Sequence, residues 1–98
     1  MKKPGDSRLI APPGLSPPVR AFWGRVVETW SLSDEGLEIL RLAVEARQRM
    51  LDAMTLLRKE GMIVRTKRGA IRAHPAARIR RDAEASFLQA MRQLGLEE

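Results

Sequence analysis

The stretch DEGLEILRLAVEARQRMLDAMTLLRKEG, residues 34–61, decides the fold of this 98-residue chain. After its first turn, neither Pro nor Gly interrupts the helical pattern before Gly61. Ser33 is a good N-cap, the two carboxylates that follow it suit the positive end of the helix dipole, and Gly61 is a typical residue to end a helix. We therefore expect one helix from about Asp34 to Glu60, roughly 40 Å long at about 1.5 Å per residue.

The apolar residues of this helix spread over an arc of roughly 200° when they are placed at steps of about 100°. One neighbouring helix covers only about half of such an arc, so we expect self-association through the remainder. Arg47 falls inside the arc, where it either pairs with a carboxylate across an interface or packs its stem while its head reaches water. The residues expected at the contact are Leu40, Val44, Arg47, Met50, Leu51 and Met54.

Upstream of this helix, residues 1–14 are rich in Lys, Pro and Gly and show no hydrophobic period, so we expect a flexible basic tail. Ser16 and Pro17 then suit the N-cap and first position of a helix. An apolar stripe follows at helical spacing, and both tryptophans on it are expected to be core anchors. The stripe consists of Val19, Phe22, Trp23, Val26, Val27 and Trp30.

Downstream, the apolar period shortens and predicts a basic β-hairpin over about residues 62–73, with Gly69 in its turn. His74-Pro75 opens a last helix, in which His74 is expected to be a boundary residue rather than a catalytic base, and Gly95 ends it. Its apolar stripe is Ile79, Ala83, Phe87, Ala90, Met91 and Leu94.

These elements predict a mostly α-helical fold with one domain over residues 15–96: an amphipathic helix, a long second helix, a short basic hairpin and a C-terminal helix. Residues 97–98 form an acidic end. The composition, 44% hydrophobic and 31% charged, fits a single globular domain rather than a disordered chain.

The charge is concentrated in one region. The chain carries a formal net charge of +6, and from residue 58 to residue 81 nine cations face one acid, Glu60. That stretch sums to +8, which leaves −2 for the rest, and such a cluster is the footprint of a polyanion binder. The alternative is a solvated face of an Arg-rich protein. The candidate DNA-binding residues are Arg58, Lys59, Arg65, Lys67, Arg68, Arg72, Arg78, Arg80 and Arg81.

Catalytic and metal-binding patterns are missing from the sequence. There is no Cys, only one His and no Gly-rich phosphate loop, and no serine lies in a nucleophile-elbow motif. We therefore expect no enzyme, no cofactor and no metal site. No apolar run is long enough to span a membrane and no secretory leader is visible, so we expect an intracellular protein.

The order of these motifs resembles the small subunit of phage terminases, in the branch of cos-type tailed phages and their prophage relatives. Pro12-Pro13 and Leu15 lead into a helix that bears Trp23, and Leu32 with Asp34 precedes the long helix. Leu56-x-x-x-x-Gly61 then leads to the Gly-turned hairpin, to His74-Pro75 and to the closing Leu94-Gly95-Leu96. The resemblance covers roughly residues 11–96.

The resemblance implies a non-enzymatic protein that forms rings of about seven or more subunits. It also implies partners: double-stranded DNA and a large subunit that holds the ATPase and nuclease, in the cytoplasm of a bacterial host. The basic hairpin and the start of the last helix would then contact phosphates, which gives salt-dependent affinity without a base code. A gene-transfer-agent version, which packages host DNA, stays open.

Two other classes stay open. The run from Leu57 to Arg65, followed by Gly69, resembles the helix-into-wing segment of winged-helix transcription regulators. Such a protein needs a turn inside the long helix, where neither Pro nor Gly occurs. An assembly adaptor that binds no nucleic acid is the third possibility.

Overall fold

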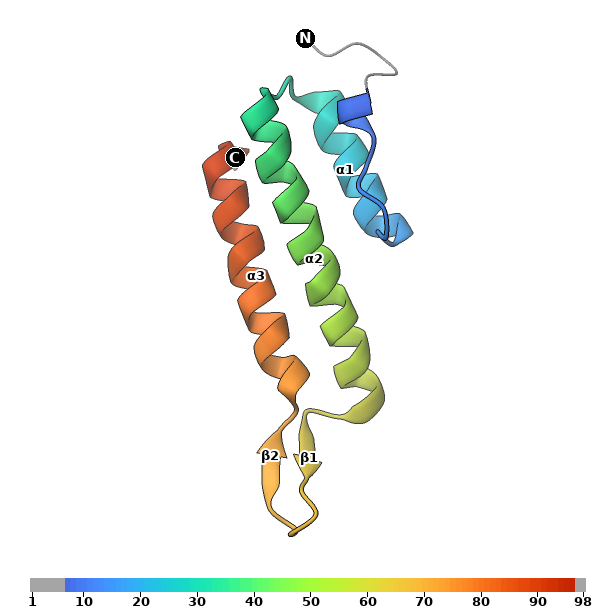
Figure 1. Ribbon diagram of the computed structural model, residues 1–98, viewed down its shortest axis with the longest axis vertical. Coiled ribbons are helices and arrows are strands. Elements are labelled where there is room, and N and C mark those ends of the chain that lie inside the picture. The colour runs from blue at the N-terminus through green and yellow to red at the C-terminus, as the bar shows by residue number, and fades with distance from the viewer. Residues whose placement is uncertain (1–6, 97–98) are drawn as a thin grey trace.

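The computed structural model describes residues 7–96 and is an elongated rod of 58 × 23 × 19 Å (Figure 1). The first six residues of the expected tail and the acidic end at 97–98 lie outside the described residues. The fold class is confirmed: three helices and a small antiparallel hairpin. The elements are η1 (Ser7–Leu9), α1 (Pro17–Thr29), α2 (Asp34–Glu60), β1 (Ile63–Arg65), β2 (Ile71–Ala73) and α3 (Pro75–Leu94).

The long helix α2 has the predicted bounds because both of its ends are capped. The Ser33 hydroxyl accepts a hydrogen bond from the Gly36 N–H at 3.0 Å. At the other end, Gly61 has a φ of 86°, a conformation that a residue with a Cβ rarely adopts. The helix therefore stops at Glu60, and the chain turns into β1.

The helices α2 and α3 run side by side along the rod, and the hairpin extends from the end opposite to the C-terminal end of α3 (Figure 1). With 13 residues against 27, α1 reaches along only about half of α2. One half of the rod is therefore a three-helix layer, and the other half is the α2–α3 pair alone.

The main core lies where α1 packs. Trp23, Leu40, Val19 and Val44 are its largest fully buried side chains, and the Trp23 indole N–H donates a hydrogen bond to the Leu9 carbonyl at 2.8 Å. Leu9 and Ala11 also pack on this core. The sequence assigned both residues to a flexible tail, so their packing differs from that expectation.

The prediction for the two tryptophans is right for Trp23 and wrong for Trp30. Trp23 is 2% exposed, whereas Trp30 is 40% exposed. The reason is local: α1 ends at Thr29, and Trp30 has extended backbone angles, so it leaves the helical stripe. Ile79 is also exposed rather than buried in the stripe of α3.

Small residues bring α2 and α3 close together. The buried residues of α3 are Ala76, Ala83 and Ala90, which are seven positions apart and so lie along one side of the helix. On α2, Ala43, Ala46 and Ala53 are buried. An exposed Ile79 follows from this arrangement, because the contact with α2 runs along the alanine row beside it.

Arg47 makes a contact that neither sequence alternative foresaw. Its guanidinium carbon lies 5.0 Å from the centre of the Phe22 ring and 5.2 Å from that of Phe87. The two rings are themselves 5.8 Å apart. Arg47 thus links α1, α2 and α3 through cation–π contacts, which explains how a charge fits inside an apolar arc.

Candidate nucleic-acid interface

Strand pairing and backbone hydrogen bonds fix the shape of the hairpin and its turn. Ile63 pairs with Ala73, Val64 with Arg72 and Arg65 with Ile71. The loop closes with a hydrogen bond from the Thr66 N–H to the Ala70 carbonyl at 2.8 Å and one from the Gly69 N–H to the Thr66 carbonyl at 2.9 Å.

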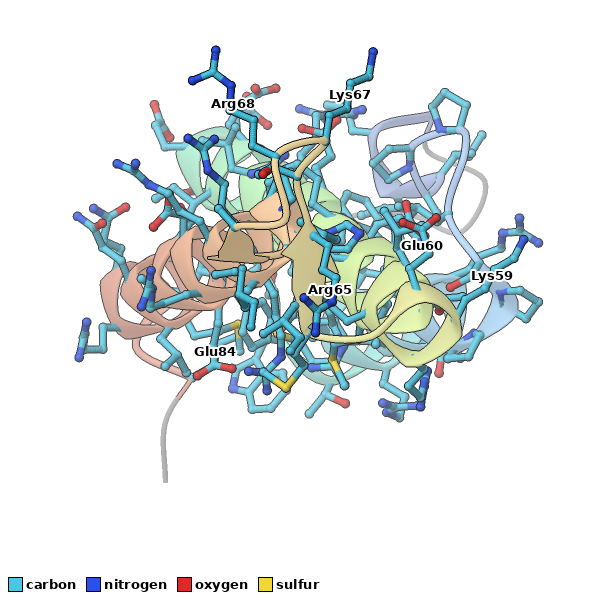
Figure 2. The ribbon with its side chains drawn as sticks, turned by 90° about the horizontal axis from the view of Figure 1, so that it is seen from below. Lys59, Glu60, Arg65, Lys67, Arg68 and Glu84 are labelled. Carbon is cyan, nitrogen blue, oxygen red and sulfur yellow. The ribbon has the colours of Figure 1, made fainter. Side chains whose placement is uncertain are left out.

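Gly69, with φ at 84°, makes the tight return possible, and the Ala70 N–H also donates to the Thr66 hydroxyl. Lys67 and Arg68 are therefore held at the tip. Figure 2 shows both side chains extending away from the strands.

Four cations lie on this hairpin without an acid among them. No Asp or Glu occurs from residue 61 to residue 73, and Arg65, Lys67, Arg68 and Arg72 are all exposed. Residues that face each other across an antiparallel pair project to the same face. Arg65 and Arg72 therefore project to opposite faces, and Lys67 and Arg68 occupy the tip between them.

The base of the hairpin is fixed by His74, the N-cap of α3. Its Nδ1 accepts a hydrogen bond from the Ala76 N–H at 3.0 Å, so the ring proton lies on Nε2. Nε2 is 2.7 Å from Oε1 of Glu60 and donates to it. The backbone N–H of His74 also donates to the Met62 carbonyl at 2.8 Å. The expectation that His74 is a boundary residue is confirmed, and this buried side chain ties α2, the hairpin and α3 together.

Two of the predicted cations on α3 have acidic neighbours one helical turn away. Arg78 lies 3.7 Å from Asp82, and Arg80 lies 3.7 Å from Glu84. The charge count along the sequence stopped at Arg81, just before these two acids, and so overstated the local positive charge. All nine predicted cations are exposed, and they lie on the half of the rod that α1 does not cover.

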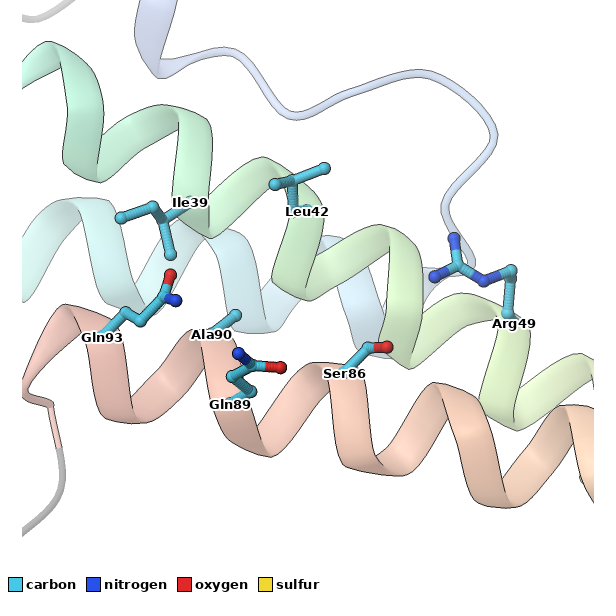
Figure 3. Close-up of a pocket in the computed structure, with 7 residues that line it drawn as sticks. All are labelled: Ile39, Leu42, Arg49, Ser86, Gln89, Ala90 and Gln93. Atoms are coloured by element: carbon cyan, nitrogen blue, oxygen red, sulfur yellow. The ribbon is translucent and has the colours of Figure 1, made fainter.

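Grooves lie between α2 and α3 in the described part of the chain. One, beside the hairpin, has a volume of about 400 Å³ and is lined by Met54, Leu57, Arg58, Gly61, Met62 and Arg80. Another has a volume of about 320 Å³ and is lined by Ile39, Leu42, Arg49, Ser86, Gln89, Ala90 and Gln93 (Figure 3). Neither lining pairs a nucleophile with a base at a hydrogen-bonding distance. Among residues 7–96, no group of three or more His, Asp or Glu side chains could hold a metal ion.

The predicted self-association residues need a correction. Leu40 and Val44 are 0% exposed, because the helices of their own chain cover them, so neither offers surface to a second copy. Leu51 packs against the same core, and the Arg47 guanidinium lies over the Phe22 and Phe87 rings of its own chain. Met50 and Met54 keep part of their surface. The sequence missed Leu42, which is 62% exposed and lines the groove of Figure 3.

In the described part of the chain, no helix is both long and apolar enough to cross a membrane. The helix α2 is unbroken, so the turn that a winged-helix regulator needs ahead of its recognition helix is missing from these residues.

Residues 20–97 match the sequence model of a family described as phage terminase, small subunit. The match covers α1 from its fourth residue onward, α2, the hairpin and α3. Searches of curated proteins and of solved structures find no match to the chain.

Proposed function

The chain belongs to the family of phage terminase small subunits, a component of the viral DNA-packaging complex, and from this membership we propose that it is a regulatory, non-catalytic subunit that binds double-stranded DNA. It recruits the large ATPase–nuclease subunit in the cytoplasm of the bacterial host. The observation that carries the DNA-binding part is the acid-free hairpin with its four exposed cations.

The hairpin makes the main DNA contacts in this proposal. Arg65, Arg72 and the two cations at the tip reach phosphates on either side of the ribbon, and backbone contacts of this kind carry no base code. Arg58, Lys59, Arg78, Arg80 and Arg81 add attraction at longer range. Arg78 and Arg80 add less, because Asp82 and Glu84 lie beside them.

The subunits form a ring of about seven or more copies in this proposal. Leu42 supports it, since a large exposed apolar side chain on the side of a rod-shaped protomer gains by burial against a neighbour. Leu88 of α3 is likewise exposed. The Leu42→Glu variant should then lower the mass measured by light scattering on a sizing column while its helical circular dichroism is retained. A wild-type mass of one or two subunits would contradict the ring.

The DNA contacts are tested by the salt dependence of duplex binding. Replacing Arg65, Lys67 and Arg68 together by Ala should weaken binding at least tenfold and lower the slope of log K against log salt by about 2–3, near 0.9 for each lost phosphate contact. The matched control removes Arg41, Arg49 and Arg92, three cations outside the hairpin, and should change the slope far less. An unchanged slope in the hairpin variant would remove the hairpin from the DNA site.

A further inference from the structure

The helix α1 packs on one side of the α2–α3 pair but covers only half of its length. On the half next to the hairpin, the same side is uncovered. Beside α1, Arg47 of α2 and Phe87 of α3 enclose the Phe22 ring. Residues seven apart in a helix lie on nearly the same side. Two turns further towards the hairpin, the equivalent positions are therefore Met54 and Arg80, and these two residues line a groove instead of contacting a third helix.

The groove continues along α3. A second hollow of about 380 Å³ shares Leu57, Met62 and Arg80 with the first and is lined also by Ala77, Arg81 and Glu84. Met62 is 67% exposed, and Leu57 lies buried at the floor. We call the two hollows together the hairpin groove. It has an apolar floor, and its rim carries Arg58, Arg80 and Arg81 against the single acid Glu84.

The chemistry of the hairpin groove selects a protein rather than DNA. Phosphates gain nothing from an apolar floor, whereas apolar side chains of a peptide are desolvated there. Arginines at the rim bind carboxylates with paired N–H donors. The open position corresponds to the place that α1 takes in the other half of the rod, so an amphipathic helix fits it best.

None of the helices in the described part of the chain combines acidic borders with a continuous exposed apolar face, which is what the groove requires. The helix α1 carries two Arg and one Glu, and α3 carries four Arg, one Asp and one Glu. The first half of α2 is acidic, but its apolar residues Leu37, Leu40 and Val44 are buried inside the protomer. Leu42 is exposed there, but a single large side chain does not make the continuous apolar face that fills a groove. We propose that the hairpin groove binds an amphipathic helix of another polypeptide, one with apolar side chains on one face and Asp or Glu along both borders of that face.

The probe is a fluorescein-labelled synthetic peptide of about 18 residues with Leu at i, i+3, i+4 and i+7 spacing and Glu at the flanking positions. A second peptide carries Lys in place of every Glu. Binding to the full chain is measured by fluorescence anisotropy at moderate salt. The acidic peptide should bind at least about tenfold more tightly than the basic one. Equal binding of the two peptides, or no binding of the acidic one, would overturn the proposal.

Two variants locate the bound peptide. Met62→Glu and Arg80→Glu should each weaken the acidic peptide about tenfold or more, because one removes apolar contact and adds repulsion and the other reverses a rim charge. Ile10→Glu and Arg92→Glu are the matched controls, since both residues are exposed outside the groove and Ile10, at 65%, is nearly as exposed as Met62. Circular dichroism confirms that each variant is folded. Loss of binding in the controls as large as in the groove variants would refute the site.

This inference stands apart from the proposed DNA contacts, and the same proteins separate the two. The hairpin variant that lacks Arg65, Lys67 and Arg68 should lose DNA but keep the acidic peptide, whereas Met62→Glu should keep DNA and lose the peptide. If Met62→Glu instead changes the subunit number on a sizing column, a second copy of the chain occupies the groove and the proposal of a different polypeptide is wrong.

Discussion

The two halves of α2 meet different surroundings although they form one unbroken helix. The half from Asp34 to Ala46 carries four acids and one Arg, and α1 and α3 cover its apolar side. The half from Arg47 to Glu60 carries four cations and two acids, and towards the hairpin α3 alone packs on it. The net charges, −3 and +2, differ by five. The comparison indicates that one end of the rod holds the main core, whereas the other end carries the surfaces that we propose for partners.

The largest effect should come from breaking the covered half. Replacing Trp23 by Ala removes a buried ring and its hydrogen bond to the Leu9 carbonyl, and should lower the free energy of unfolding by about 3–5 kcal/mol. Urea denaturation followed by circular dichroism measures this. Trp30→Ala is the control and should cost less than about 1.5 kcal/mol, because that ring is already largely exposed. Equal costs would contradict the difference in burial.

An intermediate effect is expected at the junction of the two halves with the hairpin. His74→Ala removes the acceptor for the Ala76 N–H and the partner of Glu60, and should cost about 1–2 kcal/mol of unfolding free energy. Glu60→Gln keeps an acceptor oxygen for the His74 ring and should cost less. A double-mutant cycle with Glu60→Ala measures the coupling, and a coupling of zero would show that the contact between the His74 ring and the Glu60 carboxylate contributes nothing.

The smallest effect should come from the hairpin itself. Gly69→Ala places a Cβ at a φ of 84°, with no atom within 4 Å of it, so only backbone strain of about 1 kcal/mol is expected. Amide exchange at Thr66 and Ala70 should quicken on the order of fivefold while the helices keep their protection. Gly24→Ala within α1 is the opposite control and should stabilise slightly. Faster exchange throughout the helices after Gly69→Ala would mean that the hairpin is not a separate unit.

Local chemistry made part of the fold predictable from the sequence. Ser33 and Gly61 bracket α2, and Gly69 sets the turn, because capping and a positive φ depend on single residue types. The burial of individual side chains depends on tertiary packing, which the sequence pattern does not show. The helical period alone does not say which part of the wide apolar arc α1 covers, so the burial of Leu40 and Val44 within the protomer was missed. The exposure of Trp30 depends on where α1 ends, which no cap residue signalled.

The cations of the candidate site were predictable from the sequence, but their division between the hairpin and the groove beside it was not. The count along the chain put Arg65 and Arg80 in one cluster, whereas the structure puts the first on an acid-free ribbon and the second beside Met62 and Glu84. Exposed Met62 was read only as strand sequence. Because Met62 follows the end of α2 at Gly61, no helical spacing linked it to Met54, and only the short length of α1 reveals that the groove they line is uncovered.

The two-stranded sheet has no interior strand, so both of its strands are edges whose outer N–H and C=O groups are open to pairing. Such edges invite another chain to add a strand and start aggregation. Here the bare edges belong to the most densely cationic part of the described chain, and two hairpins that approached each other would bring eight positive charges together. The charges proposed to bind DNA thus also repel the hairpins of separate molecules, so that one hairpin does not add its strands to the sheet of another.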